Sequence, residues 1–230
     1  MRMRTRLAAA VVLMGSAASA MSAPTLNPLS DAALESRDAD AMNRMGVQYA
    51  QGQGVRQDYV AALAWYERAA ANGSIAALDN IATLYFYGFG VPQSYEQAAR
   101  VLELAVDAGD ADAQNKLATL YDGGLGVAQD QPKAFELYSR AAEQGYPPAM
   151  ANLGRMYIEA RSVERNDVRG YALIRAALDT GAPASMQAMA SHELQTAAAR
   201  LDEAQLAHAR DLSSKLVATF APHAVARIEK

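Results

Sequence analysis

The sequence predicts an all-α fold, a right-handed α-solenoid of helix-turn-helix repeats with a C-terminal capping helix pair. Three observations support this prediction. Residues recur along the chain with a period of 36. Each recurring position has a clear structural role in a helix or a turn. The composition, rich in Ala and with only 8 Pro in 230 residues, favours helices that pack closely through small side chains.

The repeat is defined by positions that keep one residue through four successive units. These invariant positions are Ala41, Ala77, Ala113 and Ala149; Tyr49, Tyr85, Tyr121 and Tyr157; Val55, Val91, Val127 and Val163; Ala69, Ala105, Ala141 and Ala177; and Gly73, Gly109, Gly145 and Gly181. Two further positions keep only a size. One is always small, in Gly46, Ala82, Ala118 and Gly154, and one is always large and apolar, in Met45, Ile81, Leu117 and Leu153. A shared spacing at so many positions indicates an internal repeat.

Within each unit the pattern predicts a first helix followed by a glycine turn. Ala41, Met45 and Tyr49 are spaced four residues apart, so they lie on one face of a helix. The small residue at the invariantly small position lets another backbone approach that face. Gly52 and Gly54 follow, and their counterparts recur in the next two units, which indicates a turn with backbone conformations that other residues resist.

A second helix follows the turn, over 59–71 in the first unit, and Gly73 closes it. The position before this helix always holds a residue that caps helix N-termini, namely Asp58, Ser94, Asp130, Asn166 and Asp202. Ser94 and Gln97 have the spacing of a capping box. Before the first helices the caps are Asp38, Ser74 and Asp110. In the later units Tyr146 and Ala182 are each followed by proline, which suits the first helical position.

The pattern A-x-x-x-L-G-x-x-Y-x-x-G-x-G-V-x-x-D, then A and A-A-x-x-G, runs through residues 41–181 and resembles the Sel-one-like repeat, a relative of the tetratricopeptide repeat. The first unit matches it at Ala41, Gly46, Tyr49, Gly52, Gly54, Val55, Asp58, Ala62, Ala69, Ala70 and Gly73. The resemblance implies a solenoid whose first helices form a concave binding surface. The fourth unit departs from the pattern, because Ala160 and Ser162 replace the turn glycines and Gly170 replaces a helix alanine. We therefore expect its turn to have another shape.

The start of the chain predicts export. Three arginines in residues 1–6 precede a short apolar run over 7–15, and Ala18 and Ala20 form a small-x-small cleavage pattern, so cleavage is expected after Ala20. The expected organisation is a signal peptide over 1–20, a tether over 21–38, four repeats over 39–74, 75–110, 111–146 and 147–182, and capping helices over 183–230. The expected location is the periplasm, with the extracellular space as the alternative. No transmembrane segment is expected after cleavage.

Composition and motifs argue against several chemistries. The absence of cysteine excludes disulfides, thiolate metal sites and a cysteine nucleophile, and a net charge of −4 argues against nucleic acid as a partner. The Gly-x-Gly turns lack the strand and lysine of a phosphate loop. His192 and Glu193 begin a zinc-protease-like motif, but Thr196 stands where its second histidine belongs. His208 and His223 add no third defined ligand. We expect no catalytic residue, no cofactor and no metal.

Charged residues on the second helices are expected to form a solvated face. These residues are Glu67, Glu96, Glu103, Asp107 and Glu136, interspersed with Arg68, Arg100 and Arg140. The expected partner surface lies elsewhere, on first-helix positions that vary between units. They are Asn43, Val47, Asp79, Thr83, Asn115, Thr119 and Arg155.

The second unit also carries three aromatic residues that the repeat does not require: Phe86, Tyr87 and Phe89. Two interpretations stay open for them. They either fill a local gap in the core or form an exposed anchor for a partner.

Together these features predict a non-enzymatic scaffold or adaptor that binds a protein or peptide through a concave surface. Envelope regulation, assembly of an envelope complex and immunity against a toxin all fit this prediction. One alternative is an enzyme that hydrolyses cell-wall or β-lactam substrates, although the lack of cysteine weakens that resemblance. A second alternative is a structural stress protein without a dedicated partner.

Overall fold

A computed structural model describes residues 38–228, with side chains up to Phe220. The predicted signal peptide lies outside the described residues, as does the predicted tether apart from Asp38. In the described part every regular element is an α-helix. The helices are α3 (Ala39–Gln51), α4 (Tyr59–Ala71), α5 (Ile75–Tyr87), α6 (Tyr95–Asp107), α7 (Ala111–Gly123), α8 (Gln131–Glu143), α9 (Pro147–Glu159), α10 (Asp167–Asp179), α11 (Ala184–Ala198) and α12 (Glu203–Ile228). None of these helices has the length and apolarity needed to cross a bilayer.

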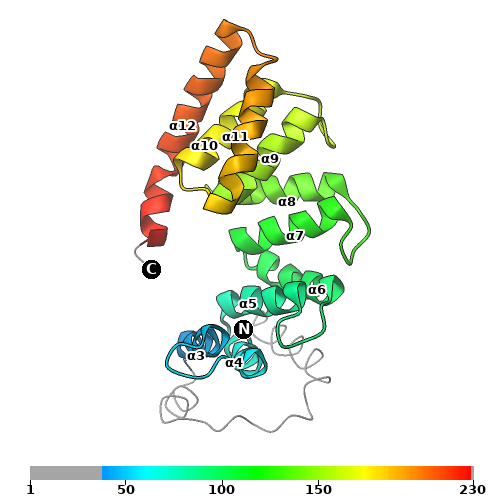
Figure 1. Ribbon diagram of the computed structural model, residues 1–230, viewed down its shortest axis with the longest axis vertical. Helices are drawn as coiled ribbons and strands as arrows, with labels where there is room; N and C mark the ends of the chain where they lie inside the picture. The colour runs from blue at the N-terminus through cyan, green and yellow to red at the C-terminus, as the bar shows by residue number, and fades with distance from the viewer. Residues whose placement is uncertain (1–37, 229–230) are drawn as a thin grey trace. The chain divides into compact units, whose positions relative to one another are not determined.

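The chain divides between Gly109 and Asp110 into two compact units. In the first unit α3 packs against α4 and α5 against α6, while α4 also packs on α5 (Figure 1). Trp65, Leu78 and Leu102 are fully buried in this unit. Alternating packing within and between pairs is the arrangement of a helical repeat, so the predicted all-α repeat fold is confirmed.

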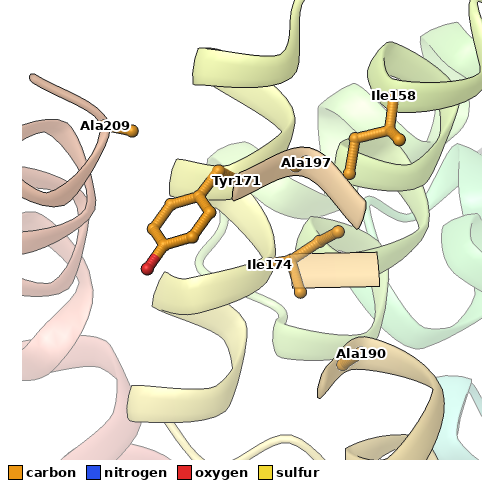
Figure 2. Close-up of a cluster of buried hydrophobic side chains, with 6 residues drawn as sticks. All are labelled: Ile158, Tyr171, Ile174, Ala190, Ala197 and Ala209. Atoms are coloured by element: carbon orange, nitrogen blue, oxygen red, sulfur yellow. The ribbon is translucent and has the colours of Figure 1, made fainter. Parts of the chain in front are cut away.

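In the second unit α7 to α10 form two further pairs, with α8 packed on α9. The last two helices differ from a repeat pair. Both α11 and α12 pack mainly against α10 rather than against each other (Figure 1). Figure 2 shows the cluster that results, with Tyr171 and Ile174 of α10 between residues from α11 and α12. Helix α10 is therefore covered by α9, α11 and α12.

Side-chain caps begin most of the helices, as predicted. The side-chain oxygens of Asp58, Ser94, Asp130 and Asn166 each accept a hydrogen bond from a backbone N–H in the first helical turn. Asp202 does the same ahead of α12. There the backbone N–H of Asp202 in turn donates to Gln205 Oε1 at 3.0 Å, which completes a capping box.

The proline starts were predicted correctly in one of two places. Tyr146 caps α9 without a side-chain bond, and Pro147 is the first helical residue. The prediction for Pro183 was wrong, because this residue has ψ 145 and lies just outside α11. Its backbone is extended, so the helix starts one residue later.

The fourth turn has the same shape as the others, contrary to our expectation. Ala160 and Ser162 adopt φ of 57° and 63°, close to the 70° and 73° of Gly52 and Gly54. The closing hydrogen bond from Asn166 N to Tyr157 O is 3.0 Å, and the equivalent bond from Asp58 in the first turn is 2.9 Å. The turn is held by its backbone hydrogen bonds, so two non-glycine residues are forced into left-handed conformations.

This strain predicts that glycine is the better residue in the fourth turn. A left-handed conformation costs a non-glycine residue about 1 kcal/mol, so Ala160→Gly should raise the free energy of unfolding by up to that amount. Urea denaturation measures the change. Ala188→Gly, in the exposed middle of α11, is the matched control and should lower stability by about 1 kcal/mol. If both variants lose the same free energy of unfolding, Ala160 is not strained in its left-handed conformation.

Candidate protein-binding site

Five aromatic rings form a contiguous group in the first unit, here called the aromatic cluster: Tyr59, Phe86, Tyr87, Phe89 and Tyr95. Phe89 stacks on Tyr59 at 5.0 Å between ring centroids and on Tyr87 at 5.4 Å. Phe86 contacts Tyr87 and Tyr95 edge-on at 4.9 and 5.0 Å. Such ring pairs add stability beyond the area they bury, so the cluster holds its rings in defined positions.

The glycine turn of the second pair brings these rings together. Gly88 ends α5 with φ 74°, and Gly90 has φ 71°. A Cβ at Gly90 would lie 2.6 Å from the Cβ of Tyr59, so only glycine lets this turn approach the start of α4. That approach places Phe89 on Tyr59. At the other side, Gln93 Nε2 donates to the carbonyl oxygen of Phe86 at 2.8 Å and contacts the Tyr95 hydroxyl at 3.1 Å.

Exposure separates the three residues that the sequence singled out. Phe86 is half-buried, whereas 59% of Tyr87 and 40% of Phe89 is exposed. With Met189 at 45%, these two rings are the exposed large apolar side chains of the described part. The cluster therefore combines a half-buried base with two accessible rings.

The polar first-helix candidates are half-buried and mostly bonded within the chain. Asn80 Nδ2 donates to Asn43 Oδ1 at 3.0 Å and links α3 to α5. The same contact recurs between α7 and α9, from Asn152 Nδ2 to Asn115 Oδ1 at 3.0 Å. These asparagines therefore tie neighbouring first helices together.

The threonine candidates are also engaged within the chain. The hydroxyls of Thr83 and Thr119 bond to the carbonyl oxygens of Asp79 and Asn115, four residues earlier. Val47, at the same position of the first repeat, is half-buried. A partner would gain less from groups that already have hydrogen bonds.

Arg155, the remaining candidate, lines a cavity of about 400 Å³ in the second unit. The cavity is bordered by Arg155, Ile158, Glu159, Arg165, His192, Glu193, Thr196 and Arg200. Arg155 and Glu193 are mostly buried and face each other at 4.0 Å. Burial raises the pKa of the Glu193 carboxyl, and the nearby Arg155 partly opposes this.

The histidines and the charged residues of the second helices are the other titratable groups that the sequence singled out. No group of three His, Cys, Asp or Glu side chains in the described part is placed to hold a metal ion. His192 lines the cavity, and the side chain of His223 lies outside the part of the chain whose side chains the structure describes. Glu96 and Arg100, both predicted to lie on a solvated face, form an exposed ion pair at 2.6 Å. The solvated-face prediction was wrong for Glu67 and Arg68, which are both half-buried. Burial also raises the pKa of the Glu67 carboxyl.

Sequence reasoning missed several residues of both features. Tyr59 and Tyr95 join the aromatic cluster, and the signal was present: their position holds tyrosine in the first two units but Gln131 and Asp167 later. Arg165 and Arg200 join Arg155 at the cavity. Here the signal was a fourth turn rich in charge where the other turns are rich in glycine.

Repeated helix pairs joined by glycine turns define an α-helical repeat protein, a class whose folds are typical of protein-interaction scaffolds. The Sel1 repeat model matches residues 39–74, 75–110, 111–146 and 147–179. The chain belongs to the Sel1 repeat family. Comparison with curated protein sequences gives no match.

Solved structures share this fold. A protective antigen of uropathogenic Escherichia coli strains that displays an SLR fold aligns with 98% of this chain at 24% identity and a TM-score of 0.75. This chain spans about half of that protein, 47% of its length. A Sel1 repeat protein from Oxalobacter formigenes aligns with 83% of this chain and 74% of its own, at 24% identity and a TM-score of 0.65.

Proposed function

We propose that this protein is a non-enzymatic periplasmic scaffold or adaptor, and that the aromatic cluster is the anchor for its protein partner. The observation that carries the proposal is the exposure of Tyr87 and Phe89, two stacked rings that the repeat itself does not require. The Sel1 repeat fold supports it, since such solenoids present extended binding surfaces.

The geometry suits an anchor. An aromatic ring has few rotatable bonds, and the stacking on Tyr59 already limits the motion of Phe89 before any partner binds. Binding therefore costs little side-chain entropy. Aromatic anchors of this kind commonly contribute about 2 kcal/mol or more each when a partner buries them. Two such rings would dominate the affinity.

The location rests on the first twenty residues. Their arginines, short apolar run and small-x-small end fit a cleaved export signal, and cleavage would leave a net charge of −7. Mass spectrometry of the protein from a periplasmic extract tests this. A mature N-terminus at Met21 is expected, and an exported form that retains Met1 would refute cleavage.

The anchor is tested with the double variant Tyr87→Ser/Phe89→Ser. Partners are first identified by cross-linking in periplasm and mass spectrometry, and the affinity of each purified partner is then measured. The double variant should bind at least about tenfold more weakly, which corresponds to about 1.4 kcal/mol. Its helical circular dichroism should be retained, and its melting temperature should fall by only a few degrees, because both side chains are largely exposed and only their ring contacts are lost.

Two controls make the result specific. Met189→Ser removes the other exposed large apolar side chain, which lies in the second unit, and should leave binding unchanged. Phe86→Leu changes the half-buried base of the cluster and should lower stability more than binding. Full affinity in the double variant would reject the anchor.

A further inference from the structure

The cavity of the second unit brings arginines together from three separate elements. Arg155 comes from α9, Arg165 from the turn between α9 and α10, and Arg200 from the turn between α11 and α12. Arg200 lies 35 positions after Arg165 and 45 after Arg155 in the sequence, so its convergence with them is a product of the fold. This cavity lies in a different unit from the aromatic cluster and is argued independently of it.

Arg155 is incompletely neutralised. Its Nη2 donates to Asn152 Oδ1 at 2.9 Å and its Nη1 to the Met189 sulfur at 3.5 Å. Its Nε is buried and has no hydrogen-bond partner. Glu193, the acidic residue that faces it, lies 4.0 Å away, which is too long for a hydrogen bond. A buried donor without an acceptor is costly, so this guanidinium favours an added acceptor.

Glu159, the other acid that lines the cavity, is already engaged, as are Asp122 and Asp167. Glu159 is bound by Arg161 at 2.7 Å, and the same arginine holds Asp122 from α7. Asp167 forms an ion pair with Arg200 at 3.2 Å. Glu193 is therefore the carboxylate that could neutralise Arg155. Burial raises the pKa of Glu193 and so disfavours its negatively charged form.

Arg165 remains available. It is exposed, and it forms no hydrogen bond or ion pair with other residues of the described part. A guanidinium presents several donors in a planar fork that matches the two oxygens of a carboxylate. An anionic group in the cavity would therefore meet one free and one under-neutralised arginine.

We propose that this cavity binds a carboxylate group of a ligand, held by Arg155 and Arg165, with Ile158 as an apolar wall beside it. The volume of about 400 Å³ exceeds what a lone carboxylate fills, so it leaves room for the small residue that carries the group. Ile158 is 4% exposed and belongs to the buried cluster shown in Figure 2, so this wall of the cavity is fixed by the core. Either the terminal carboxylate of a peptide or an acidic side chain supplies this chemistry.

The experiment measures the binding of four probes to the full chain by NMR titration and calorimetry. They are tri-alanine with a free carboxyl terminus, tri-alanine amide, N-acetyl-aspartate amide and inorganic phosphate. Tri-alanine should bind and its amide should not if the terminal carboxylate is the ligand. Binding of N-acetyl-aspartate amide instead would assign the site to acidic side chains and would equally support the proposal. Phosphate binding at least as tightly as either carboxylate would overturn it.

Variants locate the binding. Arg165→Gln should weaken carboxylate binding about tenfold without affecting the fold, since the side chain is exposed and unpaired among the described residues. Arg155→Gln should do the same, with circular dichroism to check folding. Glu193→Gln removes the competing acid and should tighten binding. Arg175→Gln, which changes an exposed arginine paired with Asp179 on α10, is the matched control. Binding that the three cavity variants leave unchanged, or no binding of either carboxylate, would refute the site.

Discussion

Gly154→Ala is expected to lower the free energy of unfolding by about 2 kcal/mol or more. A Cβ at Gly154 would lie 2.8 Å from the backbone oxygen of Gly170 and 2.7 Å from Ile174 Cγ1. The oxygen belongs to the backbone of α10, so it cannot move aside as a flexible side chain would. Helices α9 and α10 would have to separate, and overpacking of this kind typically costs 1 to 3 kcal/mol.

The matched control is Gly123→Ala, at the exposed end of α7. A Cβ there meets only the side chain of Leu125, at 3.2 Å, which can rotate away. This variant should be neutral or slightly stabilising, because alanine is the better helix former. Urea denaturation of both variants provides the measurement. A Gly154→Ala protein as stable as the control would show that α9 and α10 do not meet this closely.

Gly154 and its counterpart in the first repeat, Gly46, show why the repeat could be predicted from the sequence. Gly46 and Gly154 stand at a position that is always small, and in the structure a Cβ at either one would collide with the second helix of its pair. Position 170, where the pattern was broken, has the same explanation. A Cβ there would lie 2.6 Å from Ile158 Cγ1, so the missing methyl group admits a larger neighbour. Local rules of size and capping therefore specified the pairs.

Features that depend on contacts between distant residues could not be predicted in the same way. The fourth turn kept its shape because backbone hydrogen bonds outweigh the strain at Ala160 and Ser162, and no local rule weighs those two terms. The aromatic cluster needed Tyr59, which reaches Phe89 only because the next turn packs on α4. The cavity needed Arg155 and Arg200, 45 positions apart in the sequence.

Truncation after Leu201 removes α12 and is expected to destabilise the second unit strongly. This helix packs along α10, where Ala209 is fully buried against the cluster that contains Tyr171 (Figure 2). Farther along, Phe220 lies over Gly145, so α12 also reaches the turn between α8 and α9. Removing α12 takes away the partly buried Leu206 and Phe220 and exposes the cluster around Tyr171. Burial of a large apolar side chain contributes about 1.5 to 3 kcal/mol, so a loss of at least about 3 kcal/mol is expected. For a unit of this size, that lowers Tm by about 10 °C or more.

A pair of point variants separates loss of packing from mere shortening of the chain. Ala209→Asp places a carboxylate in the buried contact with α10, where it has no room and no partner of opposite charge in the cluster. Ala207→Asp makes the same change two residues away, at an exposed position of α12, and should alter stability by less than about 0.5 kcal/mol. We expect Ala209→Asp to melt early and to expose apolar surface that binds a hydrophobic dye, as the truncation does. A truncated chain that stays monomeric and melts cooperatively at the full-length Tm would show that α10 does not depend on α12 for its burial.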